Sequence, residues 1–224
     1  MTEFFISLTI FILAHVLPAP TGLRTRLINR FSKKSYIAGF SIFSTILLVW
    51  LIWSAIRAPY VSLWLPNYFT SLVPVILILP ACILLTTSIF KPNPISLAFV
   101  QHPNFGTSDI TTLLKHPILW SLLFWAASHT IANGDLVGLI MFGGFAIFSL
   151  VGMKIFERRA IRTLSQSEYN SAMAKTDGPL VLRLKNMMSW AMAMEVIAGI
   201  ILYVIVLHLH EPVIGIDPLV QLLP

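Results

Sequence analysis

The chain has 224 residues, of which 57% are hydrophobic and 11% are charged, and its formal net charge is +6. Soluble domains carry about a quarter charged residues, so this composition excludes an ordinary soluble domain, and the low charge also excludes a disordered chain. Fourteen of the fifteen Lys and Arg residues lie in three segments between apolar stretches, at 24–34, 91–115 and 154–185. This distribution follows the positive-inside rule of membrane proteins and argues against nucleic-acid binding. We therefore predict an all-α, polytopic transmembrane helical bundle in the lipid bilayer, forming a single domain over residues 1–224.

The apolar stretches are taken in chain order, at about 20 residues for each crossing of a bilayer. The uncharged stretch 58–90 is too long for one helix. Its first half is rich in proline and aromatic residues, which predicts an interfacial loop before the third span. Residues 91–115 are polar and contain three prolines, so we predict a loop there, and Asn133-Gly134-Asp135 predicts a tight turn. About six spans are expected, at residues 4–23, 35–56, 71–90, 116–133, 136–153 and 186–207.

Six spans place both chain ends on the same side of the membrane. The three basic segments then face the cytoplasm, and Arg57 is the one basic residue left outside. The expected location is the bacterial inner (plasma) membrane, with both termini in the periplasm.

Polar side chains inside a bilayer are costly, so each one is a candidate for function. The predicted spans or their ends hold His15, His116, His129, Glu195, His208 and His210. Residues two apart do not share a helix face, so His208 and His210 are not expected to act as joint ligands and are placed at the interface. Glu195 lies about 10 Å inside the inner boundary by helical rise, so we expect it to pair with an arginine or a histidine, or to stay protonated.

Several histidines within membrane spans favour haem binding, because imidazole is a common axial ligand of haem iron. Two histidines from different helices would clamp the macrocycle inside the bundle. Zinc is the competing metal, but it usually takes three or four ligands, and neither an HExxH motif nor a cysteine pair is present. The one cysteine, Cys82, lies in an apolar stretch and is interpreted as a small buried side chain.

Two segments carry a resemblance to a known family. LLKHPILWSLLFWAASHTIANGDLVGLIMFGG at residues 113–144 and AHVLPAPTGLR at residues 14–24 resemble the NnrU family of membrane proteins, with similarity over about residues 1–160. That family is named for a link to nitrite and nitric oxide reduction, and it is similar to zeta-carotene isomerase, a haem b membrane protein. The resemblance implies axial haem ligands at His15 and His129. Ala126 stands where the isomerase has a cysteine, which argues against a thiolate switch at that position.

The histidine of the isomerase's Arg-His-Pro motif falls on His116. By helical rise in the predicted topology, the α-carbons of His15 and His129 differ in depth by about 12 Å, against about 7 Å for His15 and His116. His116 is therefore kept as an alternate ligand. Lys115-His116-Pro117, together with Glu157-Arg158-Arg159 and Glu168-Tyr169, also loosely resembles membrane methyltransferases of the isoprenylcysteine carboxyl type.

The expectation is a haem b protein with His15 and His129 as metal ligands and with redox or small-ligand chemistry linked to denitrification. Its ligand would be apolar or gaseous, and its partners would be respiratory or denitrification membrane complexes. A membrane-embedded isomerase or methyltransferase-like enzyme on an apolar substrate is one alternative, and a non-catalytic assembly factor is another. Whether the protein is an enzyme is left open.

Overall fold

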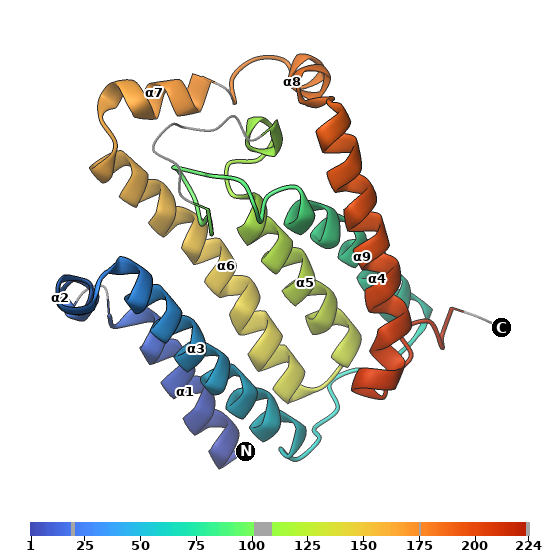
Figure 1. Ribbon diagram of the computed structural model, residues 1–224. Helices are drawn as coiled ribbons and strands as arrows, with labels where there is room; N and C mark the ends of the chain where they lie inside the picture. Colours follow the sequence, from blue (N-terminus) through green and yellow to red (C-terminus); the bar gives the residue numbers. More distant parts are fainter. Residues whose placement is uncertain (19–20, 101–108, 175, 223–224) are drawn as a thin grey trace. The chain divides into compact units, whose positions relative to one another are not determined.

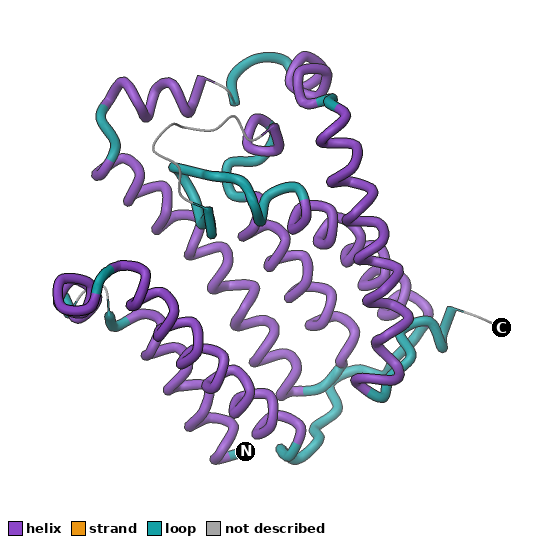
Figure 2. The backbone as a smooth tube through the Cα atoms, viewed as in Figure 1, coloured by secondary structure: helices purple, strands orange, loops and turns teal. Residues whose placement is uncertain are grey.

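The structure is a computed structural model and describes residues 1–224 except 19–20, 101–108, 175 and 223–224. Within this part of the chain the regular structure is helical, and Figure 2 shows helices joined by loops. The helices are α1 (Thr2–Val16), α2 (Leu23–Phe31), α3 (Lys33–Ile56), α4 (Tyr68–Thr86), the 3-10 helix η1 (Asp109–Thr112), α5 (Pro117–Asn133), α6 (Leu136–Thr163), α7 (Gln166–Ala174), α8 (Leu180–Met187) and α9 (Trp190–Ile214) (Figure 1). The predicted all-α class is confirmed.

The chain divides into two compact units, and the first comprises residues 1–63 and 135–137. In this unit α1 and α3 form an antiparallel pair. The buried hydroxyls of Ser7 and Ser54 lie 2.6 Å apart, and the indole nitrogen of Trp50 donates to Glu3 at 3.3 Å. Both contacts join α1 to α3, so polar side chains as well as apolar ones hold this helix pair together.

The second unit comprises residues 64–134 and 138–224. Here α4 packs against both α5 and α9, and the Ser121 hydroxyl on α5 donates to the Ala81 carbonyl on α4 at 2.7 Å. Helix α6 meets α5 where Gly152 faces Leu119. Where α9 begins, buried Leu84, Ile110 and Met192 form one apolar cluster joining α4, η1 and α9.

Among the residues that the structure describes, four helices have the length and apolar composition to cross a membrane: α3, α4, α6 and α9. The other two predicted spans coincide with α1, of 15 residues, and α5, of 17 residues. These two helices are apolar but rise only about 22 and 26 Å, less than the hydrocarbon core of about 30 Å. The prediction of about six spans thus holds as an approximate count.

Several predicted span boundaries were wrong. The first span, expected to run to residue 23, ends at Val16, two residues before Pro18, because proline has no backbone N–H to continue the helical hydrogen bonds. The fifth span was expected at 136–153, and α6 begins at Leu136 as expected but continues as a helix to Thr163, past the expected end of the crossing. Charged side chains favour water or lipid headgroups over the hydrocarbon core, but they leave the backbone hydrogen bonds of a helix intact. They therefore do not end the helix.

The last span was expected at 186–207 and is found at Trp190–Ile214. It begins after Ser189, whose hydroxyl accepts a hydrogen bond from the Met192 amide, and ends at Gly215 with φ 86°. These are the N-cap and C-terminal glycine signals of a helix. The predicted turn at Gly134 is confirmed by its φ of 65° between α5 and α6.

The close packing of α4 and α9 depends on Gly199. A Cβ at this position would lie 2.7 Å from the backbone Cα of Ile83 and 2.8 Å from the Thr86 hydroxyl. We expect Gly199→Ala to lower the free energy of unfolding by about 1–3 kcal/mol, because the backbone of α4 cannot move aside cheaply. Denaturant unfolding in mild detergent measures this loss. Gly144→Ala is the control, since nothing lies within 4 Å of its added Cβ, and an equal loss in both variants would contradict the packing explanation.

Candidate functional site

His15 lies on the face of α1 that meets α3. Its Nδ1 is 2.7 Å from the Phe11 carbonyl one turn earlier, and its Nε2 is 2.9 Å from the Ser44 hydroxyl of α3. The rings of Phe11 and Phe40 lie 4.3 and 5.4 Å from the imidazole, centroid to centroid. The carbonyl makes Nδ1 the protonated nitrogen, so the lone pair is on Nε2, directed at a hydroxyl that can donate to it.

His129 occupies a similar environment on α5, in the second unit. Its Nδ1 is 2.8 Å from the Trp125 carbonyl. The ring packs between Trp125 and Phe142, with centroid separations of 4.9 and 4.8 Å. A carbonyl partner on Nδ1 fixes the tautomer that presents Nε2 as a ligand, and metal-binding histidines usually have such a partner. His15 and His129 thus share the same Nδ1 partner, the carbonyl four residues earlier, each within its own unit.

The structure places a further imidazole, His210 of α9, beside His129. The two ring centroids are 6.4 Å apart, and the Nδ1 of His210 is 2.7 Å from the Ile216 carbonyl. Sequence reasoning placed His210 at the interface and did not associate it with His129. The two residues are 81 positions apart on different helices, so no local pattern connects them. His208 is exposed, with its Nδ1 2.8 Å from the Val204 carbonyl.

His116, the alternate ligand, has a different environment at the other end of α5. It is 6% exposed, and its Nδ1 has no hydrogen-bond partner among the described residues. Thirteen residues separate His116 from His129, or about 20 Å along the helix, so these two cannot bind one metal ion together.

Glu195 has a partner that the sequence analysis did not name. Its Oε2 lies 2.7 Å from the Nζ of Lys91, and the two side chains are 26% and 21% exposed. The expectation of an arginine or histidine partner was wrong. Lys91 follows the end of α4, and its long chain reaches Glu195 on α9 beside the bond from the Thr86 hydroxyl to the Glu195 carbonyl.

We expect Glu195→Gln to lower the free energy of unfolding by about 2 kcal/mol, because it leaves the largely buried Lys91 ammonium without its carboxylate. Unfolding midpoints in detergent measure this loss. The double variant Lys91→Met/Glu195→Leu should recover most of it, since two apolar side chains need no ion partner. Glu157→Gln is the matched control, because its pair with Lys115 is longer, at 3.3 Å, and more exposed. If the double variant has a lower free energy of unfolding than Glu195→Gln, the prediction is contradicted.

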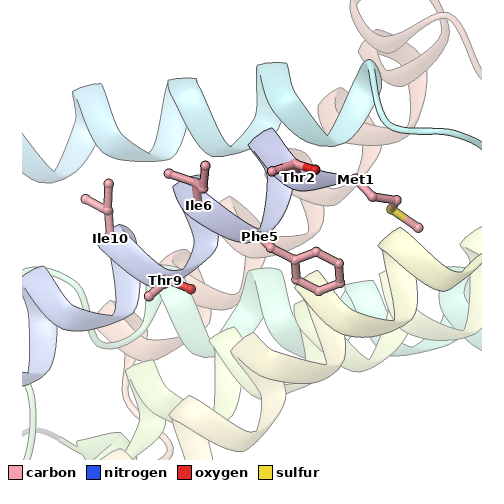
Figure 3. A pocket seen from close by; sticks show the side chains of 6 residues that line it. All are labelled: Met1, Thr2, Phe5, Ile6, Thr9 and Ile10. Carbon is pink, nitrogen blue, oxygen red and sulfur yellow. The ribbon is translucent and has the colours of Figure 1, made fainter.

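The other candidate features do not bring metal-binding side chains together. The hollow in Figure 3 is lined by Met1 and the α1 residues Thr2, Phe5, Ile6, Thr9 and Ile10, and none of these side chains is a metal ligand of histidine, cysteine or carboxylate type. Among the residues that the structure describes, no group of three or more His, Cys, Asp or Glu side chains could hold a metal ion.

Long apolar helices with polar residues along their packed faces define an α-helical integral membrane protein that carries histidines within its helices. The family model described as NnrU protein matches residues 3–218, nearly the whole chain. The protein therefore belongs to the NnrU family, and the match extends past residue 160, where the sequence resemblance was expected to fade. No curated protein and no solved structure matches the chain.

Proposed function

We propose that this NnrU-family membrane protein binds haem b, with His129 and His15 as axial ligands, and serves redox or small-ligand chemistry linked to nitrogen-oxide metabolism. The observation that carries the proposal is the shared geometry of the two imidazoles. In each, Nδ1 faces the carbonyl four residues earlier, and aromatic rings surround the side chain. Bound haem would supply an iron that changes oxidation state or takes a gaseous ligand.

The chain's own residues account for binding and orientation. The Phe11 and Trp125 carbonyls hold the imidazoles in one tautomer and raise the basicity of Nε2. Phe142 and Trp125 offer an apolar, polarisable wall around His129 that suits a flat macrocycle. At His15, the Ser44 hydroxyl must leave Nε2 before a metal can bind there.

The nitrogen-oxide role comes from family membership and the name of that family. The isomerase alternative has less support here, because Ala126 stands at the position of the isomerase's cysteine and is fully buried. The methyltransferase-like alternative rests on residues around His116, whose lysine neighbour is bonded to Glu157. The methyltransferase-like alternative does not use the imidazole geometry at His129.

The test is the visible spectrum of the protein purified in mild detergent after expression with ample haem, oxidised and dithionite-reduced. A Soret band with sharp reduced α and β bands is expected, with about one haem per chain by pyridine haemochrome assay. A colourless protein would overturn the haem proposal and leave the methyltransferase-like and assembly-factor alternatives. Nitric oxide added to the reduced protein should shift the Soret band, and an unchanged spectrum would contradict a nitrogen-oxide ligand.

The second axial ligand is tested separately, because two histidines compete for it. His15→Ala is expected to convert the low-spin spectrum to a high-spin one while haem stays on His129. His210→Ala is the comparison, since its ring lies 6.4 Å from His129. If His210→Ala becomes high-spin and His15→Ala does not, the pair is His129 and His210, and the assignment of His15 is wrong.

A further inference from the structure

Helix α6 (Figure 1) has more residues than a bilayer crossing requires. Its 28 residues rise about 42 Å, whereas a hydrocarbon core is about 30 Å thick. About twenty residues from Leu136 complete the crossing, which reaches position 155. The last two turns, residues 156–163, therefore lie at the depth of the lipid headgroups.

Three arginines share one face of these last turns. Arg158, Arg159 and Arg162 follow Ile155 at the helical spacing of three, four and seven residues, which forms one stripe. With Ile155 and Thr163 they line one shallow hollow. All three arginines are exposed, and none forms an ion pair with a described residue. Ala160 is buried, at 2% exposure, so the packed side of the helix differs from the arginine side.

The nearby carboxylate does not neutralise this face. Glu157 is bonded to Lys115, at 3.3 Å between Oε1 and Nζ. The arginine stripe is therefore a local concentration of three guanidinium groups, and each can form two parallel hydrogen bonds to phosphate oxygens.

The same stripe continues toward the membrane centre as an apolar surface. Ile147, Val151 and Ile155 recur every four residues and are 63%, 46% and 58% exposed. Phe148, also exposed, lies beside them. One exposed face of α6 is thus apolar along the crossing and cationic at headgroup depth, which matches the polarity of a phospholipid.

We propose that this face of α6 binds an anionic phospholipid, with its phosphate held by Arg158, Arg159 and Arg162 and an acyl chain along Ile147 and Val151. A lipid with net negative charge is selected, because a zwitterionic headgroup carries its own cation, which the guanidinium groups repel. The site is independent of haem, since none of its residues is an expected haem ligand.

The test measures binding of phosphatidylglycerol to the full-length protein in detergent by native mass spectrometry, with phosphatidylcholine and inorganic phosphate as comparison ligands. The variant Arg158→Gln/Arg159→Gln/Arg162→Gln is expected to bind phosphatidylglycerol about 100-fold more weakly, which corresponds to about 1 kcal/mol for each arginine. The matched control is Arg24→Gln/Arg26→Gln/Arg30→Gln on α2. It removes the same charge from a nine-residue helix that cannot extend across a bilayer. The affinity of this control variant for phosphatidylglycerol should differ less than threefold from that of the wild type.

Equal losses in the two triple variants would show a general charge effect and overturn the proposal. Equal affinities for phosphatidylglycerol and phosphatidylcholine would also overturn it, as would inorganic phosphate binding as tightly as the lipid. If the glutamine variant does not fold, Arg158→Lys/Arg159→Lys/Arg162→Lys takes its place. That variant keeps the charge but loses the paired hydrogen bonds, so about tenfold weaker binding is expected, and wild-type affinity in it would contradict the arginine site.

Discussion

His129→Ala is expected to lower the haem content of the purified protein at least about tenfold, because it removes an imidazole that we propose as an axial ligand of the iron. The size of the effect follows from ligation. Loss of a group that merely orients a ligand costs 10–100-fold in metal affinity, and loss of the ligand itself should cost at least as much. The remaining aromatic side chains, Trp125 and Phe142, could contact the macrocycle but offer no strong ligand to the iron. Haem-to-protein ratios by pyridine haemochrome assay measure the change.

His208→Ala is the matched control for this prediction. His208 has the same Nδ1 arrangement, 2.8 Å from the carbonyl four residues earlier, but its ring is exposed. Its replacement should leave haem content unchanged. Added imidazole should restore part of the spectrum in His129→Ala, since the deleted ring leaves space for it. Normal haem content in His129→Ala, with or without imidazole, would remove His129 from the site.

Gly134→Ala is expected to lower the free energy of unfolding by about 3 kcal/mol or more, through two separate penalties. The φ of Gly134 is +65°, a left-handed conformation that costs a residue with a Cβ about 1–2 kcal/mol. The added Cβ would also lie 2.5 Å from the Trp64 carbonyl oxygen. That oxygen is backbone and is positioned by the hydrogen bond from the Trp64 amide to the Gly134 carbonyl, at 3.1 Å, so it cannot move without breaking the turn.

Gly22→Ala separates the two penalties. Gly22 has a similar φ of +71°, but nothing lies within 4 Å of its added Cβ. Its replacement should therefore cost only the conformational part, about 1–2 kcal/mol. Unfolding in detergent, followed by tryptophan fluorescence, measures both variants. Equal losses in the two would show that contact with the Trp64 carbonyl contributes nothing.

Much of the fold could be predicted because membrane helices are encoded locally. Apolar stretches of sufficient length predicted α3, α4, α6 and α9, and Asn133-Gly134-Asp135 predicted the turn that follows α5. The errors lie at helix ends. Capping bonds decide those ends, such as Asn67 accepting from the amides of Phe69 and Thr70 at the start of α4, and hydropathy does not detect them.

The candidate site was predictable only in part. The resemblance to the NnrU family singled out His15 and His129, and the structure shows that each has a carbonyl partner on Nδ1. The carbonyl in each case belongs to the residue four positions earlier, so the sequence contains this geometry once a helix is assumed. His116 was kept as an alternate because its expected depth is closer to that of His15, and its lack of an Nδ1 partner among the described residues depends on the surrounding packing.

By itself, the sequence determined that this is an α-helical membrane protein, where most of its helices lie, and which polar side chains they carry. These features depend on apolar length and on spacing within one helix. Only the tertiary structure decided that His210 lies beside His129 and that Glu195 pairs with Lys91, 104 residues away. Both pairings join side chains on different parts of the second unit, and helix packing sets their positions. Packing depends on shape complementarity between distant surfaces, which no local pattern of residues records.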